Sequence, residues 1–86
     1  MFVEQAPRTA AVIAEYAEHE RWDSVAEHAH ALKGMSATIG ASRVSQVAAA
    51  IEAIAKATAP DPSQMSALLP DLDDTLARTA VAFDNA

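Results

Sequence analysis

The chain has 86 residues, with six basic and twelve acidic side chains and no cysteine. A chain of this length provides one hydrophobic core, so we expect a single domain over residues 1–86. The absent cysteines exclude disulfides and thiolate metal sites, and a formal charge of −6 with scattered basic residues argues against nucleic-acid binding. With neither a signal-peptide pattern nor an apolar run of the roughly 20 residues that span a bilayer, we expect a cytoplasmic protein that does not bind membranes.

Four helices are predicted in chain order, and no segment alternates with the period of a strand. The first runs from about residue 2 or 4 to residue 19, with an apolar stripe that comprises Phe2, Ala6, Ile13, Tyr16 and Ala17. Pro7 fits this helix if it lies in the first turn, where its missing N–H has no helical partner. The alanine-rich composition, with two Phe, one Tyr and one Trp, favours closely spaced helices.

The second helix is expected to open near Asp23 or Ser24 and to run to Ile39. Ser24 and Glu27 have the spacing of a capping box, in which each side chain bonds a free backbone N–H of the first turn. Gly40 is expected to end the helix. A three-then-four apolar spacing defines the buried stripe, which comprises Val25, Ala29, Leu32, Ser36 and Ile39.

Ser42 is predicted to cap the third helix, whose apolar face continues until the segment Pro60-Asp61-Pro62 ends it. The fourth helix spans roughly residues 63–83. Pro70 either kinks this helix or marks its true start, with residues 63–69 as a looser turn. Short connections make successive helices antiparallel neighbours, so we expect an all-α, up-down-up-down four-helix bundle.

His30, Lys33 and Gly34 share one face of the second helix, beside its buried stripe. A single helical histidine is usually a solvated surface residue. Here a lysine and a glycine follow three and four positions later, one turn along and on either side of the ring. Glycine inside a helix costs about 1 kcal/mol relative to alanine, so its presence indicates that something approaches the backbone closely. An exposed histidine in these surroundings could accept and release a phosphoryl group.

Glu52 is predicted to lie at the same height in the bundle as His30. The second and third helices turn near Ala41, eleven residues after His30 and eleven before Glu52. At ~1.5 Å per residue, each lies roughly 16 Å from the turn. Glu52 could then accept a hydrogen bond from one imidazole nitrogen and leave the other as a nucleophile. A competing interpretation makes Glu52 a surface carboxylate paired with Lys56, and spacing alone does not choose between them.

The run A-H-x-L-K-G-x-S-x-x-x-G-A, which covers residues 29–41, resembles the signature of the histidine-containing phosphotransfer (HPt) domains of bacterial multistep phosphorelays. Trp22-Asp23 and Ile51-Glu52 extend the resemblance over roughly residues 2–58. It implies a small helical bundle in which His30 takes a phosphoryl group from an aspartyl phosphate on one receiver domain and passes it to another. It also favours Glu52 as the residue that orients the ring.

On this hypothesis Lys33 offsets the charge of the phosphorylated ring, and Gly34 clears space for the phosphoryl donor. The docking surface around His30 is expected to include three small residues, Ala26, Ala37 and Ala41.

The resemblance implies receiver domains of response regulators and hybrid histidine kinases as partners. The Mg²⁺ needed for transfer would then be held by the receiver, and the chain itself needs no cofactor. No ATP-binding or kinase motif is present, so we expect a stoichiometric carrier and not an enzyme. His28 and His30 lie two residues apart on nearly opposite helix faces, which argues against a metal site.

Three alternatives concern how the chain acts. We expect a monomer, although the short N-terminus could favour self-association. The chain is either free-standing or one domain of a hybrid kinase. A function of another class is a non-transferring bundle that binds and inhibits a histidine kinase or receiver, with His30 incidental.

Overall fold

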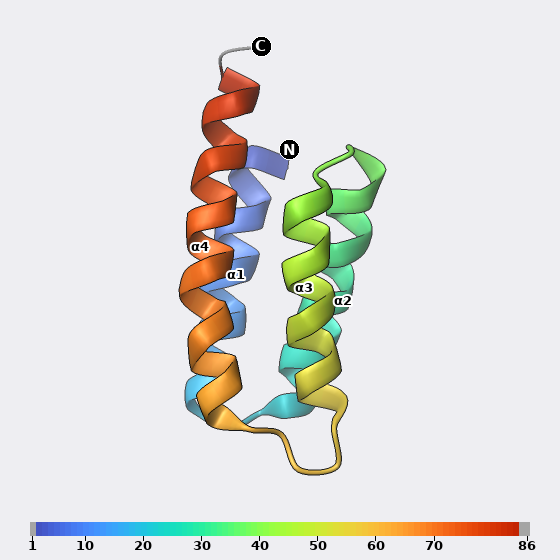
Figure 1. Cartoon of the computed structure of the whole chain (residues 1–86), viewed down its shortest axis with the longest axis vertical. Coiled ribbons are helices and arrows are strands. Elements are labelled where there is room, and N and C mark those ends of the chain that lie inside the picture. Colours follow the sequence, from blue (N-terminus) through green and yellow to red (C-terminus); the bar gives the residue numbers. More distant parts are fainter. Residues whose placement is uncertain (1, 85–86) are drawn as a thin grey trace.

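The computed structural model describes the backbone of residues 2–84 and the side chains of residues 4–79. Four helices account for most of this range, and it contains no strand. They are α1 (Phe2–Glu18), α2 (Trp22–Thr38), α3 (Ser42–Lys56) and α4 (Pro62–Asp84). The molecule measures 41 × 20 × 16 Å, with all four helices along its long axis (Figure 1). The prediction of an all-α four-helix bundle is confirmed.

The helices are arranged so that each contacts two others. α2 packs against α1 and α3, and α4 packs against the same two helices, which leaves α1 and α3 on one diagonal and α2 and α4 on the other. Successive helices run in opposite directions in Figure 1, as their short connections require.

Within the described residues, none of the helices is both long and apolar enough to cross a bilayer.

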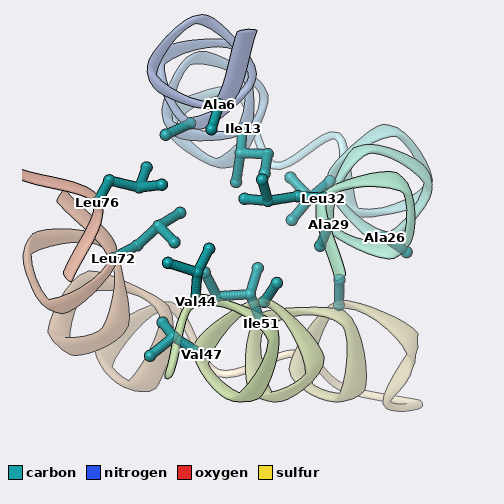
Figure 2. Close-up of a cluster of buried hydrophobic side chains, with 14 of the residues drawn as sticks. Ala6, Ile13, Ala26, Ala29, Leu32, Val44, Val47, Ile51, Leu72 and Leu76 are labelled. Carbon is teal, nitrogen blue, oxygen red and sulfur yellow. The ribbon is translucent and has the colours of Figure 1, made fainter. Parts of the chain in front are cut away.

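The hydrophobic core fills the space between the four helices (Figure 2). Ile13, Leu32, Ile51 and Leu72 are completely buried there, one from each helix. The stripe predicted for α2 is correct at its first four positions, all of which have no exposed surface. It is wrong at Ile39, which is 42% exposed because α2 ends one residue earlier.

The most extensive contact in the bundle is that of α2 with α3. Each of the two helices buries an alanine completely, Ala29 in α2 and Ala48 in α3, and short side chains allow two helix backbones to approach. The hydroxyl of Ser45 on α3 donates a hydrogen bond of 3.3 Å to the carbonyl of Lys33 on α2. The contact therefore fixes the height of α3 relative to the residues around His30.

Two turns of similar backbone geometry begin α2 and α3. Glu20 (φ 56°) and Gly40 (φ 78°) both adopt the left-handed conformation that closes a helix. The next residues, Arg21 and Ala41, each donate a backbone hydrogen bond to a carbonyl five residues earlier, at 2.9 and 2.8 Å. The prediction that Gly40 ends the second helix is confirmed.

These turns start the following helices earlier than the sequence patterns predict. The N-cap residues are Arg21 and Ala41, and neither makes a side-chain capping hydrogen bond. The capping box of Ser24 and Glu27 is therefore wrong, because Ser24 already lies inside the first turn of α2. The cap predicted at Ser42 is wrong for the same reason, since Ser42 is the first helical residue of α3.

The prolines lie at different places in the helices. α1 begins at Phe2, so Pro7 lies in its second turn and not in its first. α3 ends at Lys56, before the proline segment, and α4 begins at Pro62 after Asp61, whose carboxylate accepts a 2.8 Å hydrogen bond from the N–H of Ser63. α4 continues through Pro70, so the alternative in which the helix starts there is wrong.

Candidate functional site

The site is centred on His30, which α2 presents to solvent. Its side chain is 67% exposed, whereas the preceding residue, Ala29, is completely buried. The Nδ1 atom of the ring lies 2.9 Å from Oε2 of Glu52 on α3. The ring is therefore held at one nitrogen while most of its surface remains accessible.

Glu52 is almost completely buried, with a side chain that is 7% exposed. Both of its carboxylate oxygens are occupied. Oε1 accepts a hydrogen bond of 2.8 Å from the Lys33 ammonium, and Oε2 lies 3.0 Å from Nζ of Lys56 as well as close to His30. The competing interpretation of Glu52 as a surface partner of Lys56 is thus half right, since the pair forms but the carboxylate is buried.

The surroundings of Glu52 keep it ionised. Hydrogen bonds from Lys33 and Lys56, and a weaker contribution from His30, lower the pKa of the carboxyl group from 4.5 to about 2 against the opposing effect of burial. An ionised carboxylate only accepts hydrogen bonds, so the proton between Glu52 and His30 belongs to Nδ1. In the neutral imidazole, Nε2 then carries the free lone pair.

Lys33 extends from α2 to α3 and is partly exposed to solvent. Its side chain is 36% exposed, and its ammonium points to Glu52 on α3. The lysine is therefore anchored one turn from His30, where its charge lies next to the ring. Its effect on a bound phosphoryl group stays a prediction.

The small residues around His30 differ in how exposed they are. Gly34 and Ala37 are exposed, and Ala41 is half-buried at the turn into α3. Ala26 is buried, with only 7% of its surface accessible, and its place in the docking surface stays a prediction. A Cβ atom built at Gly34 meets no atom within 4 Å, so the space above this backbone is open.

A hollow of about 570 Å³ adjoins His30 on the side away from Gly34. The residues that line it include Ala26 of α2 and Ala55 of α3, together with Glu52 and Lys56. Lys56 is not among the predicted site residues, and its spacing of four residues from Glu52 is the sequence signal for the ion pair that the structure contains.

The other histidine of α2, His28, is separate from this site. Its ring lies against Tyr16 of α1 at a centroid distance of 5.4 Å, and its Nδ1 lies 2.8 Å from the carbonyl oxygen of Ser24. Among the described residues, no group of three or more histidine, cysteine or acidic side chains could hold a metal ion.

Comparison with known proteins identifies the family. A family model described as the Hpt domain matches residues 1–82, so the relationship extends well beyond the segment of residues 2–58 that carries the sequence resemblance. Searches of curated proteins and of solved structures gave no match. Hpt domains are four-helix bundles that carry phosphoryl groups on a histidine in phosphorelays, and they have no kinase activity of their own. The chain belongs to the Hpt domain family.

Proposed function

We propose that the protein relays a phosphoryl group between aspartates of receiver domains, with His30 as the residue that carries it. The observation that supports this most directly is the contact between the exposed His30 ring and the buried, ionised Glu52. This contact fixes the orientation of the ring through Nδ1 and leaves Nε2 as the ring nitrogen available for attack.

The reaction needs no proton transfer at His30. The Nε2 lone pair attacks the phosphorus of an aspartyl phosphate, an N–P bond forms, and the P–O bond to the aspartate breaks with its electrons going to the departing carboxylate. The Nδ1 proton stays on the ring. The ring becomes cationic, and the Glu52 carboxylate at 2.9 Å stabilises this charge. A carboxylate oxygen of a second receiver aspartate then attacks the phosphorus of phosphorylated His30, a P–O bond forms, and the N–P bond breaks with its electrons returning to Nε2 as the lone pair.

The charged groups around the ring favour the phosphorylated state. Lys33 and Lys56 each contact Glu52, so two ammonium groups are held on the carboxylate that contacts the ring. Together with the cationic ring they offset the roughly two negative charges of a phosphoryl group near neutral pH. Catalysis consists of positioning and charge compensation, and the Mg²⁺ that assists transfer is held by the receiver.

Gly34, Ala37 and Ala41 would form the part of the docking surface on the Gly34 side of the ring. The open space above Gly34 supports this role, because a receiver must bring its aspartate to within bonding distance of His30. We propose that one monomer suffices for each transfer, since the residues around the ring come from a single chain.

The test is transfer from receiver domains that carry a ³²P-labelled aspartyl phosphate. The parent protein and a His28→Ala control should take up label from at least one receiver of a panel, and His30→Ala should take up none. The bond should be stable in alkali and labile in acid, as a phosphoramidate is. If receivers bind the parent protein but never label it, the chain is instead an interaction module that blocks its partner.

A further inference from the structure

The hollow beside His30 has an uneven distribution of charge. Asp23 and Glu27 of α2 lie along one wall, four residues apart and both exposed, and Lys56 of α3 lies on the opposite wall. Between the walls are the buried methyl groups of Ala26 and Ala55. The hollow is thus apolar at its base and charged at its rim.

The two basic side chains near the hollow share one carboxylate, that of Glu52. The ammonium group of Lys56 lies 3.0 Å from Oε2 of Glu52, and that of Lys33 bonds the other oxygen of the same carboxylate. Among the ion pairs of the described side chains, neither Asp23 nor Glu27 has a cationic partner. Asp23 and Glu27 together carry two negative charges against the single excess positive charge of Glu52 with its two lysines, so the net charge of these five side chains is −1.

The stability of α2 accounts for the position of Asp23 but not for that of Glu27. Asp23 lies in the first turn of α2, where a carboxylate interacts favourably with the helix dipole. Glu27 lies beyond that turn, and like charges four residues apart on a helix repel each other. Glu27 thus weakens α2 slightly, and a partner that supplies the opposite charge would remove this repulsion.

We propose that this hollow determines which receivers the protein accepts, by taking a receiver surface that places an apolar side chain against Ala26 and Ala55 and a basic side chain facing Asp23 and Glu27. The inference rests on the proposed phosphotransfer function and adds the charge of the partner to it. Charges at the rim of an interface act mainly on the rate of association and on its salt dependence, so Glu27 is a specificity-determining residue and not a catalytic one.

The experiment compares Glu27→Lys with Asp73→Lys, which makes an equivalent charge change at an exposed position of α4, a helix that does not contact α2. The probe is a purified, ³²P-labelled receiver domain that transfers to the parent protein. At low salt, Glu27→Lys should reduce the second-order rate of transfer about three- to tenfold, and the maximal rate at saturating receiver should stay within about twofold. Asp73→Lys should match the parent, and about 0.5 M salt should remove most of the difference.

Two further measurements separate this inference from the proposed function. Labelling by phosphoramidate, a small donor that does not need the docking surface, should be equal in all three proteins. A receiver in which the facing basic residue is changed to glutamate should transfer faster to Glu27→Lys than to the parent. Equal effects of Glu27→Lys and Asp73→Lys, or no effect of either, would overturn the specificity role while leaving phosphotransfer intact. Absence of transfer to the parent from every receiver would overturn both.

Discussion

His30 and Glu52 are 22 residues apart in the sequence, and the imidazole Nδ1 of one lies 2.9 Å from the carboxylate Oε2 of the other. The exposed ring is thus held by a buried anion on the neighbouring helix. Because the same carboxylate also binds two lysines, any change at Glu52 alters both the orientation of the ring and the charge around it.

The first prediction separates these two effects of Glu52. In Glu52→Gln the amide oxygen still accepts a hydrogen bond from Nδ1–H, so phosphoryl transfer should slow only a few-fold. In Glu52→Ala the ring loses its partner, and transfer should be slower than in Glu52→Gln. Rates of phosphoryl uptake from one labelled receiver measure both variants. Equal rates in the parent and both variants would show that Glu52 does not orient the ring.

The second prediction concerns the pH dependence of stability. The folded-state pKa of Glu52 is lowered to about 2, so its ionised form stabilises the fold above the unfolded value of about 4.5, and this contribution is lost as the pH falls from 4.5 towards 2. Glu52→Gln should therefore be less stable than the parent at pH 7, on the order of 2–3 kcal/mol. Urea unfolding at pH 7 and pH 3 measures the difference. A difference that does not shrink at pH 3 would contradict the assigned charge interaction.

The third prediction compares the two lysines. Lys33→Ala should slow transfer about fivefold, as expected for the loss of about 1 kcal/mol of charge stabilisation. Lys56→Ala should slow it less, because Lys56 is 63% exposed and Lys33 is 36% exposed, and solvent screens the more exposed charge more strongly. Arg78→Ala, on α4, is the control for a general loss of positive charge. A rate for Lys33→Ala equal to that of this control would remove Lys33 from the site.

The fourth prediction is that stability and transfer change in opposite directions at Gly34. An added Cβ meets no atom within 4 Å, so Gly34→Ala should stabilise α2 by up to about 1 kcal/mol. A larger side chain in Gly34→Leu would fill the space that a receiver must enter, and transfer should fall sharply while the protein remains folded. Melting temperature and transfer rate are measured on the same samples. Parental transfer by Gly34→Leu would show that the glycine does not clear space for the donor.

The fifth prediction uses the two helix-closing turns as a matched pair. Glu20 adopts a left-handed conformation that is unfavourable for a side chain with a Cβ, so Glu20→Gly should be neutral or stabilising by up to about 1 kcal/mol. Gly40→Ala introduces the same strain at the other turn and should destabilise by about 1 kcal/mol. Thermal unfolding of both variants tests this, and the opposite order would contradict the turn geometry.

The helix ends show where sequence patterns are weakest. Ser24 and Ser42 have the residue type and spacing of caps, yet both lie inside helices. Backbone hydrogen bonds that close α1 and α2 set where the next helices begin, and those bonds depend on Glu20 and Gly40 adopting positive φ. A positive φ at Gly40 is expected from its residue type, but at Glu20 no residue preference signals it.

Apolar spacing along the chain predicts four helices, the first four positions of the stripe that α2 buries and the exposure of His30 beside Lys33, because helical periodicity is a local property. Equal separations from the turn also indicated that Glu52 would lie level with His30. Only the tertiary structure decided that Glu52 is buried, that it binds both Lys33 and Lys56, and that a hollow with an acidic wall adjoins the ring. These features depend on how closely α2 and α3 approach and on their rotation about their own axes, which packing between helices determines and no single helix encodes.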